Sequence, residues 1–249
     1  MFYNSENQIT TLDEADYSKL LKITKHLIHQ VYMPQLGLYS TMSQDELWLS
    51  LVLQFCVVSG KRMAEDLRSD EKKLHEFGKK LNFRYLTSLK SNRKKYIADV
   101  LKSYKATSFY NKQAERIEEV LNSPKVIDQN KFILLKDINY EKQSHKEIRD
   151  ILMKRVPHFK LKSASDFMIE NGLSIEVLAI NTRIGEVLNH HFRLNLTNNR
   201  IQTNKRIYES VENCLRRGCE KIGVPLAYMS RMLYYYSEKD TISYILENL

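Results

Sequence analysis

Glycine and proline are scarce in this sequence, with 7 and 4 among its 249 residues. These two residues interrupt helices most strongly, so their scarcity favours helical structure along most of the chain. Leucine, lysine, glutamate, isoleucine and arginine are plentiful, and most of them are good helix formers. Apolar residues make up 43 % of the chain, which is enough for a hydrophobic core. The composition therefore predicts an all-α fold.

Cysteine is also rare, and its three positions do not form a disulfide framework. Cys56 lies in an apolar run and is expected to be a small buried hydrophobic residue. Cys214 and Cys219 have no histidine near them at the spacing of a zinc site. We therefore expect a reducing compartment, no metal site and no cofactor.

Long hydrophobic runs are absent as well. The longest apolar stretch, residues 47–58, is interrupted by Ser50 and Gln54 and is shorter than the ~20 residues that cross a bilayer. The N-terminus lacks the basic segment and apolar run of a secretory signal. These absences predict a cytoplasmic protein that makes no use of a membrane.

Acidic residues are fewer than basic ones, 30 against 39, and the formal net charge is +9. Such a surplus suits a polyanionic partner, with nucleic acid first and an acidic membrane surface second. On charge alone, a protein that binds a polyanion and a soluble protein that is merely basic are equally good interpretations.

Apolar residues recur at helical spacing in nearly every segment. Ser144 can cap a helix over residues 145–155, because Glu147 stands at the third position of a capping box. Thr41 or Ser43 can cap an earlier helix, and Gly223 is suited to end a long helix over residues 203–222. Residues 132–138 are a short apolar run that could be helix or strand, and we predict helix because no partner strand is evident.

The most informative segment runs from His145 to about His190. A predicted helix ends near Arg155, Pro157 breaks it, and a second helix begins near Lys162. A turn of this kind can aim backbone N–H groups at a phosphate, helped by the N-terminal end of the second helix. That contact holds a DNA strand without reading its bases. Apolar surroundings would favour the neutral amine of Lys162, which is the form that attacks a sugar carbon.

On the local pattern alone, an ordinary turn with a solvated lysine is the better interpretation. A resemblance changes this balance. The string Val-Pro-His-Phe-Lys-Leu-Lys-Ser-Ala-Ser-Asp-Phe at positions 156–167 resembles the hairpin of the 8-oxoguanine DNA glycosylases of the helix-hairpin-helix superfamily. The compact archaeal-type branch is the most similar, since there Lys-x-Ala-Ser-x-Phe is followed by Asn-x-Gly or a similar string, and here Asn171-Gly172 follows. Residues 46–60, 177–184 and 223–234 resemble that family's early helix, its entry to the catalytic carboxylate and its C-terminal helix pair.

The resemblance implies a two-lobed helical DNA glycosylase fold. One lobe would comprise residues 41–178, with the helix-hairpin-helix motif at about 145–171, and the other residues 1–40 and 179–249. The implied function is that of a monomeric N-glycosylase and AP lyase that removes an oxidised purine, 8-oxoguanine, from double-stranded DNA. The damaged base would be flipped into a pocket, and a lysine Schiff base would form.

The resemblance also assigns candidate site residues. Lys162 would be the nucleophile, and Asn181 stands 19 positions later, where the family usually has an aspartate. The candidate DNA-binding residues are His158, Phe159, Lys160, Leu161 and Arg183. The candidate base-pocket residues are Trp48, Gln54, Met229, Ser230 and Leu233.

The sequence departs from the family pattern at three of these positions. His158 and Lys160 replace glycines, whose freedom at positive φ permits a close approach to a phosphate. Asn181 can orient a lysine, but it cannot take a proton or stabilise a cationic sugar. Three explanations are open: another carboxylate, Asp166 or Asp137, replaces it in function; the chain is a non-catalytic DNA-binding relative; or the substitution is engineered. Reduced activity is therefore expected, and a non-catalytic helix-hairpin-helix protein is the alternative.

Overall fold

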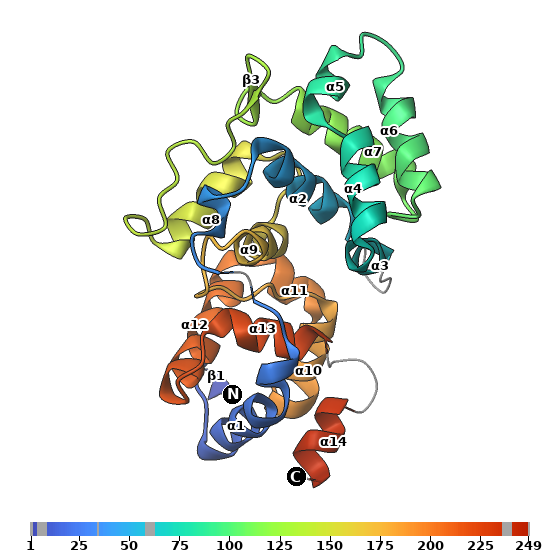
Figure 1. Cartoon of the computed structure of the whole chain (residues 1–249). Coiled ribbons are helices and arrows are strands. Elements are labelled where there is room, and N and C mark those ends of the chain that lie inside the picture. The colour runs from blue at the N-terminus through green and yellow to red at the C-terminus, as the bar shows by residue number, and fades with distance from the viewer. Residues whose placement is uncertain (1, 4–8, 34, 58–62, 236–240, 249) are drawn as a thin grey trace. The chain divides into compact units, whose positions relative to one another are not determined.

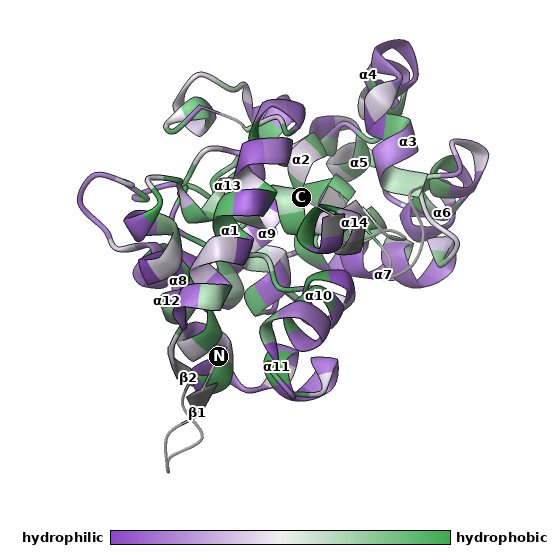
Figure 2. Cartoon of the chain, turned by 90° about the horizontal axis from the view of Figure 1, so that it is seen from below, coloured by the Kyte–Doolittle hydropathy of each residue, from purple (hydrophilic) through white to green (hydrophobic). Residues whose placement is uncertain are grey.

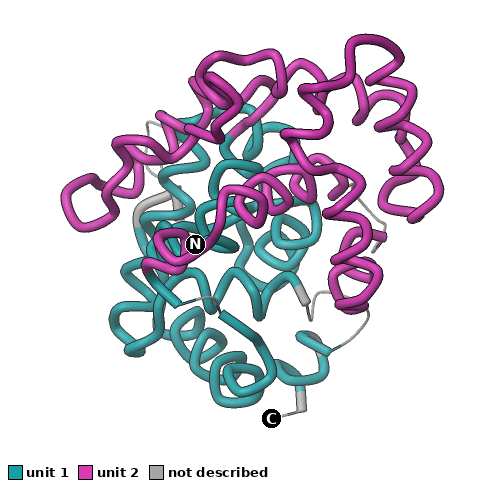
Figure 3. Tube along the Cα trace, turned by 45° about the horizontal axis from the view of Figure 1, so that its top comes forward, with its two compact units in different colours: residues 1–36, 161–249 teal, residues 37–160 magenta. Residues whose placement is uncertain are grey.

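Nearly all the regular structure of the protein is helical, in a computed structural model that describes residues 2–3, 9–33, 35–57, 63–235 and 241–248 (Figure 1). The predicted all-α fold is confirmed. Individual helices carry both hydrophobic and hydrophilic residues, as helices that bury one face do (Figure 2). Within the described residues, no helix combines the length and the hydropathy that crossing a bilayer requires. The chain divides into two compact units, which are coloured separately in Figure 3.

Unit 1 comprises residues 1–36 and 161–249. Its elements are β1 (Phe2–Tyr3), β2 (Ile9–Thr11), α1 (Glu14–Leu27), the 3₁₀ helix η1 (Ile28–Gln30), α9 (Leu161–Glu170), α10 (Thr182–Phe192), α11 (Asn198–Thr203), α12 (Lys205–Lys221), α13 (Leu226–Tyr235) and α14 (Thr241–Asn248). Strands β1 and β2 pair antiparallel. Helix α13 packs against α1, α10 and α12, and Met229, Met232 and Leu233 on it are fully buried. This helix therefore forms the centre of the unit's core.

Unit 2 comprises residues 37–160. Its elements are η2 (Leu38–Ser40), α2 (Gln44–Cys56), α3 (Met63–Ser69), α4 (Glu71–Lys80), α5 (Phe83–Ser88), α6 (Arg93–Ser103), α7 (Tyr110–Leu121), β3 (Ile127–Asp128), β4 (Lys131–Phe132) and α8 (His145–Arg155). Helix α2 packs against α3, α4, α7 and β4. Its residue Trp48 is buried, and the indole N–H donates to the Leu81 carbonyl at 2.6 Å. The Trp48 ring also meets the rings of Phe83 and Phe132 edge-on, so it anchors this core.

Several helix ends follow local sequence signals. Ser43 and Ser144 begin α2 and α8 with complete capping boxes, in which Glu46 and Glu147 accept from the cap backbone. Gly223, with φ +71°, follows the C-terminal end of α12. The left-handed conformation there is the reason for glycine at this position.

The prediction of a helix over residues 132–138 is wrong. Phe132 instead pairs with Ile127 in a two-stranded antiparallel hairpin, and turns follow it. Gln129 and Asn130 form the connecting turn at φ +45° and +61°, a geometry that suits tight hairpins. A strand pair of this length is too short to leave an alternating pattern in the sequence.

The boundaries between the two units differ from those of the predicted lobes. The predicted lobes divide the chain after residues 40 and 178, whereas the two compact units divide it after residues 36 and 160. The difference concerns α9 and the segment that follows it. Within unit 1, α9 is bonded to α12 and α13, because Ser165 lies 3.4 Å from the Tyr208 hydroxyl and Glu170 accepts from Arg231 at 2.5 Å.

Candidate active site

Lys162 lies in the first turn of α9. Its Nζ donates to Oδ2 of Asp166 at 3.1 Å, because residues four apart lie on the same face of a helix. The two side chains are 21 % and 15 % exposed, so they are shielded from most water but can still be reached. The structure thus places a proton acceptor in direct contact with the candidate nucleophile, an arrangement suited to covalent catalysis.

The turn before α9 contains a left-handed residue. His158 adopts φ +67° at a position where the resemblance expects glycine. Histidine tolerates this region better than most residues with a side chain. Its Nε2 lies 2.5 Å from Oε2 of Glu119 on α7, a contact that glycine could not make. The turn therefore keeps a glycine-like backbone at this residue without a glycine.

The other candidate DNA-binding residues of the turn differ in exposure. Phe159 and Leu161 are buried, and the Phe159 ring lies 5.6 Å from that of Phe55. Lys160 is exposed. Of these three residues, only Lys160 presents a charged side chain to a polyanion.

Asn181 is the N-cap of α10. Its Oδ1 accepts from the N–H of Ile184 at 2.9 Å. An aspartate could make the same bond, since both residues are favoured at this position. The amide therefore preserves the cap, and what the site lacks is the negative charge.

The segment before Asn181 is buried, and no strand in the described part of the chain pairs with it. Its backbone groups are satisfied by side chains instead. The Tyr208 hydroxyl on α12 donates to the Leu178 carbonyl at 2.5 Å and accepts from the Ile180 N–H at 3.1 Å. Between them, the Ala179 N–H donates to Oγ of Ser230 on α13 at 3.2 Å. These bonds fix the path of the chain into the N-cap of α10.

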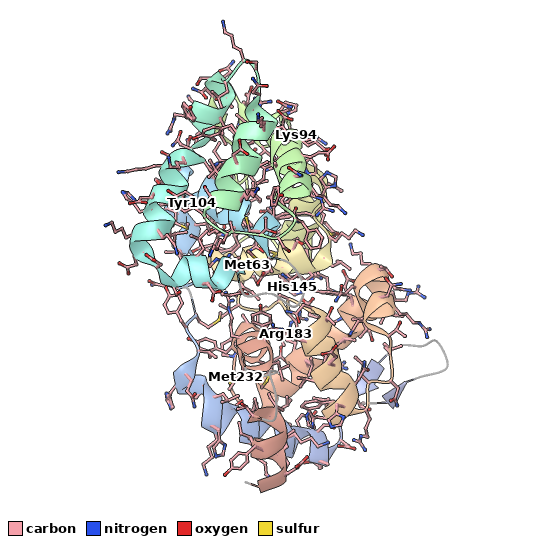
Figure 4. The ribbon with its side chains drawn as sticks, turned by 90° about the vertical axis from the view of Figure 1, so that its right-hand side faces the viewer. Met63, Lys94, Tyr104, His145, Arg183 and Met232 are labelled. Carbon is pink, nitrogen blue, oxygen red and sulfur yellow. The ribbon has the colours of Figure 1, made fainter. Side chains whose placement is uncertain are left out.

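Arg183 follows Asn181 in the first turn of α10. Its guanidinium carbon lies 5.3 Å from the centre of the Tyr234 ring on α13, within the range of a cation–π contact. Arg183 is partly exposed, and it is labelled together with Met232 of α13 in Figure 4. Its side chain is therefore partly accessible at the same helix end as Asn181.

The candidate base-pocket residues come from both units. Met229 and Leu233 are fully buried in the core of unit 1, and Ser230 bonds to the backbone before Asn181. Trp48 is a core residue of unit 2, as described above. Gln54, also in unit 2, is 6 % exposed, and neither its amide nitrogen nor its oxygen has a hydrogen-bond partner among the residues that the structure describes. A buried amide without partners is costly, which makes Gln54 the most unusual of the five.

The two alternative carboxylates have different surroundings. Asp166 contacts the Lys162 amine, whereas Asp137 lies exposed in a turn of unit 2 at φ +65°. Asp166 is thus the alternative carboxylate that contacts the candidate nucleophile within unit 1. The described residues include no group of three or more His, Cys, Asp or Glu side chains that could hold a metal ion.

No family model matches the chain, and a search of curated proteins finds no match. The structure matches the crystal structure of Methanocaldococcus jannaschii 8-oxoguanine DNA glycosylase with a TM-score of 0.59, at 18 % identity over 88 % of this chain and 92 % of that one. A crystal structure of the M. jannaschii 8-oxoguanine glycosylase/lyase with a 15mer DNA containing 8-oxoguanine gives a TM-score of 0.61, at 17 % identity over 88 % and 95 %.

The chain has the fold of an 8-oxoguanine DNA glycosylase. The likeness extends over most of both chains, so it is not confined to the segments that carry the sequence resemblance. Within this glycosylase fold, sequence reasoning missed Tyr208 and Glu119, which support the segment before Asn181 and the turn before Lys162. Of the two, Tyr208 was the easier to predict from the sequence, since a tyrosine among the apolar positions of a helix needs a buried partner for its hydroxyl.

Proposed function

We propose that this protein is a DNA glycosylase and AP lyase that removes an oxidised purine, 8-oxoguanine, from double-stranded DNA through Lys162. The observation that carries the proposal is the contact between Lys162 and Asp166 in a chain with the glycosylase fold. The excess of basic residues supports a DNA partner, as does the DNA bound to one of the similar structures.

The proposed reaction begins at C1′ of the damaged nucleotide, after the base is flipped from the helix. The lone pair of the Lys162 amine forms a bond to C1′ as the glycosidic bond breaks. The base leaves with the electron pair of the broken glycosidic bond and takes up a proton. The nitrogen, which has gained a bond, releases a proton, and opening of the sugar ring gives a Schiff base. Loss of a C2′ proton then expels the 3′ phosphate and cuts the strand.

Asp166 is the proposed acceptor for the proton that the amine releases, because its carboxylate already accepts a hydrogen bond from Nζ. It would thereby take one of the roles that an aspartate at position 181 would have. The other role is stabilisation of the positive charge on the sugar during base loss, and Asn181 is neutral. We therefore expect a working enzyme whose base-loss step is slower than an aspartate would allow.

A second candidate function is that of a DNA-binding protein without catalysis. The amide at position 181 favours it, because that residue can cap α10 without contributing charge. The two candidates differ in one observable, a covalent bond between protein and DNA.

Borohydride trapping tests the proposal. The protein is incubated with duplexes that carry 8-oxoguanine or an abasic site, and the Schiff base is reduced to a stable adduct. We expect an adduct with the wild type and none with Lys162→Gln. Lys221→Gln, an exposed lysine on α12, is the control and should form the adduct at the wild-type rate.

If Lys162→Gln formed the adduct as fast as the wild type, Lys162 would be ruled out as the nucleophile. If the wild type binds these duplexes but forms no adduct with either one, the non-catalytic candidate is favoured.

A further inference from the structure

The Tyr208 hydroxyl connects two parts of the candidate active site. It contacts Ser165, which lies on α9 between Lys162 and the end of that helix, at 3.4 Å. It also bonds to the carbonyl of Leu178 and the N–H of Ile180, the residue immediately before Asn181. Ser165, Leu178 and Ile180 lie 43, 30 and 28 positions before Tyr208 in the sequence, so the contacts depend on the tertiary fold.

Burial makes these contacts important for the local geometry. Tyr208 and Ser165 are both 0 % exposed, and Leu178 and Ile180 are 0 % and 1 % exposed. At such a buried site, water cannot replace a lost hydrogen bond, and a buried polar group without a partner lowers stability. The hydroxyl therefore constrains the segment before Asn181 more strongly than a surface contact could.

The position of Ser165 relative to Lys162 extends this constraint to the nucleophile. Ser165 is three residues after Lys162 and directly before Asp166, so it shares a helical turn with the amine-bearing residue. A contact that fixes Ser165 also fixes how this part of α9 is rotated about the helix axis and where it lies along that axis. The same oxygen fixes the backbone that ends at Asn181.

We infer that Tyr208 is a positioning residue, whose hydroxyl sets the distance between the Lys162 helix and the N-cap residue Asn181. The inference rests on the proposed function for its effect on catalysis. Tyr208 does not touch the reacting atoms, and it acts by holding the two residues that do. Displacements of about 1 Å in active sites can reduce rates roughly a hundredfold, so even a small relaxation of α9 should be measurable.

The test uses three variants and an abasic duplex, which requires no recognition of a damaged base. Tyr208→Phe removes the bonds of the hydroxyl, and Ser165→Ala removes its contact to α9 while keeping its bonds to Leu178 and Ile180. Tyr39→Phe is the matched control, because its hydroxyl also donates to a backbone carbonyl, that of Ile138 in unit 2, at 3.2 Å.

At saturating DNA, we expect Tyr208→Phe and Ser165→Ala to slow Schiff-base formation by about tenfold or more, with DNA affinity unchanged within about twofold. The rate is calculated per active molecule, from the final amount of trapped adduct, so that partial unfolding does not count. The double variant should be no slower than Tyr208→Phe, because both changes remove one shared contact. Tyr39→Phe should match the wild type.

Wild-type rates per active molecule in Tyr208→Phe and Ser165→Ala, or additive losses in the double variant, would overturn the inference. Failure of the wild type to trap abasic DNA would instead contradict the proposed function. In that case amide hydrogen exchange decides the positioning role. Tyr208→Phe should then speed exchange at Ile180 more than at amides elsewhere in α10 and α12, and unchanged exchange at Ile180 would overturn it.

Discussion

The amine of Lys162 donates a hydrogen bond to the carboxylate of Asp166 one helical turn further along α9, at 3.1 Å. This contact lies within a single helix, so it depends only on the helix and on two side-chain rotamers. It gives the candidate nucleophile a local proton acceptor, although position 181 carries an amide.

Asp166→Asn should separate the role of this carboxylate from that of helix structure. The amide keeps the size of the side chain and can still accept from the lysine, but it cannot take a proton. We expect Schiff-base formation with an abasic duplex to slow by roughly a hundredfold, the lower range for loss of a general base. Thermal unfolding should change much less than the rate, since the amide oxygen can keep the hydrogen bond from the lysine. A rate equal to that of the wild type would show that another group accepts the proton.

Asn181→Asp should raise the rate of base excision. The aspartate can keep the bond to the Ile184 N–H, and its charge also interacts favourably with the N-terminal end of α10. We expect single-turnover excision of 8-oxoguanine to become at least about tenfold faster, since electrostatic groups of this kind are worth ~2.7–4 kcal/mol in other enzymes. DNA affinity should stay equal or weaken slightly through repulsion from phosphates. Asn181→Ala, which loses the cap, is the contrasting variant and should lower stability by about 1 kcal/mol.

DNA binding should depend steeply on salt. Each phosphate that the protein neutralises contributes a slope of about −0.9 to the plot of log affinity against log salt. Lys160→Ala, at the exposed end of the turn before α9, should reduce that slope by about one unit. Lys94→Ala is the control, because Lys94 on α6 is half exposed and pairs with Glu115. Fluorescence anisotropy with an undamaged duplex measures the salt dependence of affinity for both variants and the wild type. A flat salt dependence of the wild type would contradict the proposal that DNA is the partner.

His158 offers a test of backbone strain. His158→Ala loses the contact with Glu119 but keeps a side chain at φ +67°. His158→Gly loses the same contact and relieves the strain of that conformation, which costs roughly 1–2 kcal/mol in residues with a Cβ. Glycine should therefore give the more stable variant of the two, by about 1 kcal/mol after its greater freedom in the unfolded chain is counted. Urea denaturation followed by circular dichroism measures the difference, and a less stable glycine variant would show that the turn relaxes without strain.

Local signals in the sequence predicted the helix ends best. The capping box of Ser144 and Glu147 and the glycine after α12 involve residues within a few positions of each other, and both appear in the structure. The helix over residues 145–155 and the start of the next helix near Lys162 were predicted closely for the same reason.

Contacts between distant residues could not be predicted in this way. Nothing near Tyr208 indicates that its hydroxyl bonds to backbone groups 28 and 30 positions earlier. The compact unit to which α9 belongs was not evident for a related reason, since α9 is bonded to residues of α12 and α13 that lie far along the chain. The contact between Lys162 and Asp166 is an intermediate case: the spacing of four was visible, but the side-chain conformations were not.

The three cysteines are distributed between the units, with Cys56 in unit 2 and Cys214 and Cys219 in unit 1. Each is 1 % exposed, and burial raises the pKa of Cys56 and Cys219 to about 12. Alkylating reagents require an accessible thiolate, so the folded protein should resist them. Labelling can then occur only when a unit opens, and mass spectrometry of the labelled peptides distinguishes the two. The native thiols thus act as internal reporters of which half of the chain unfolds first.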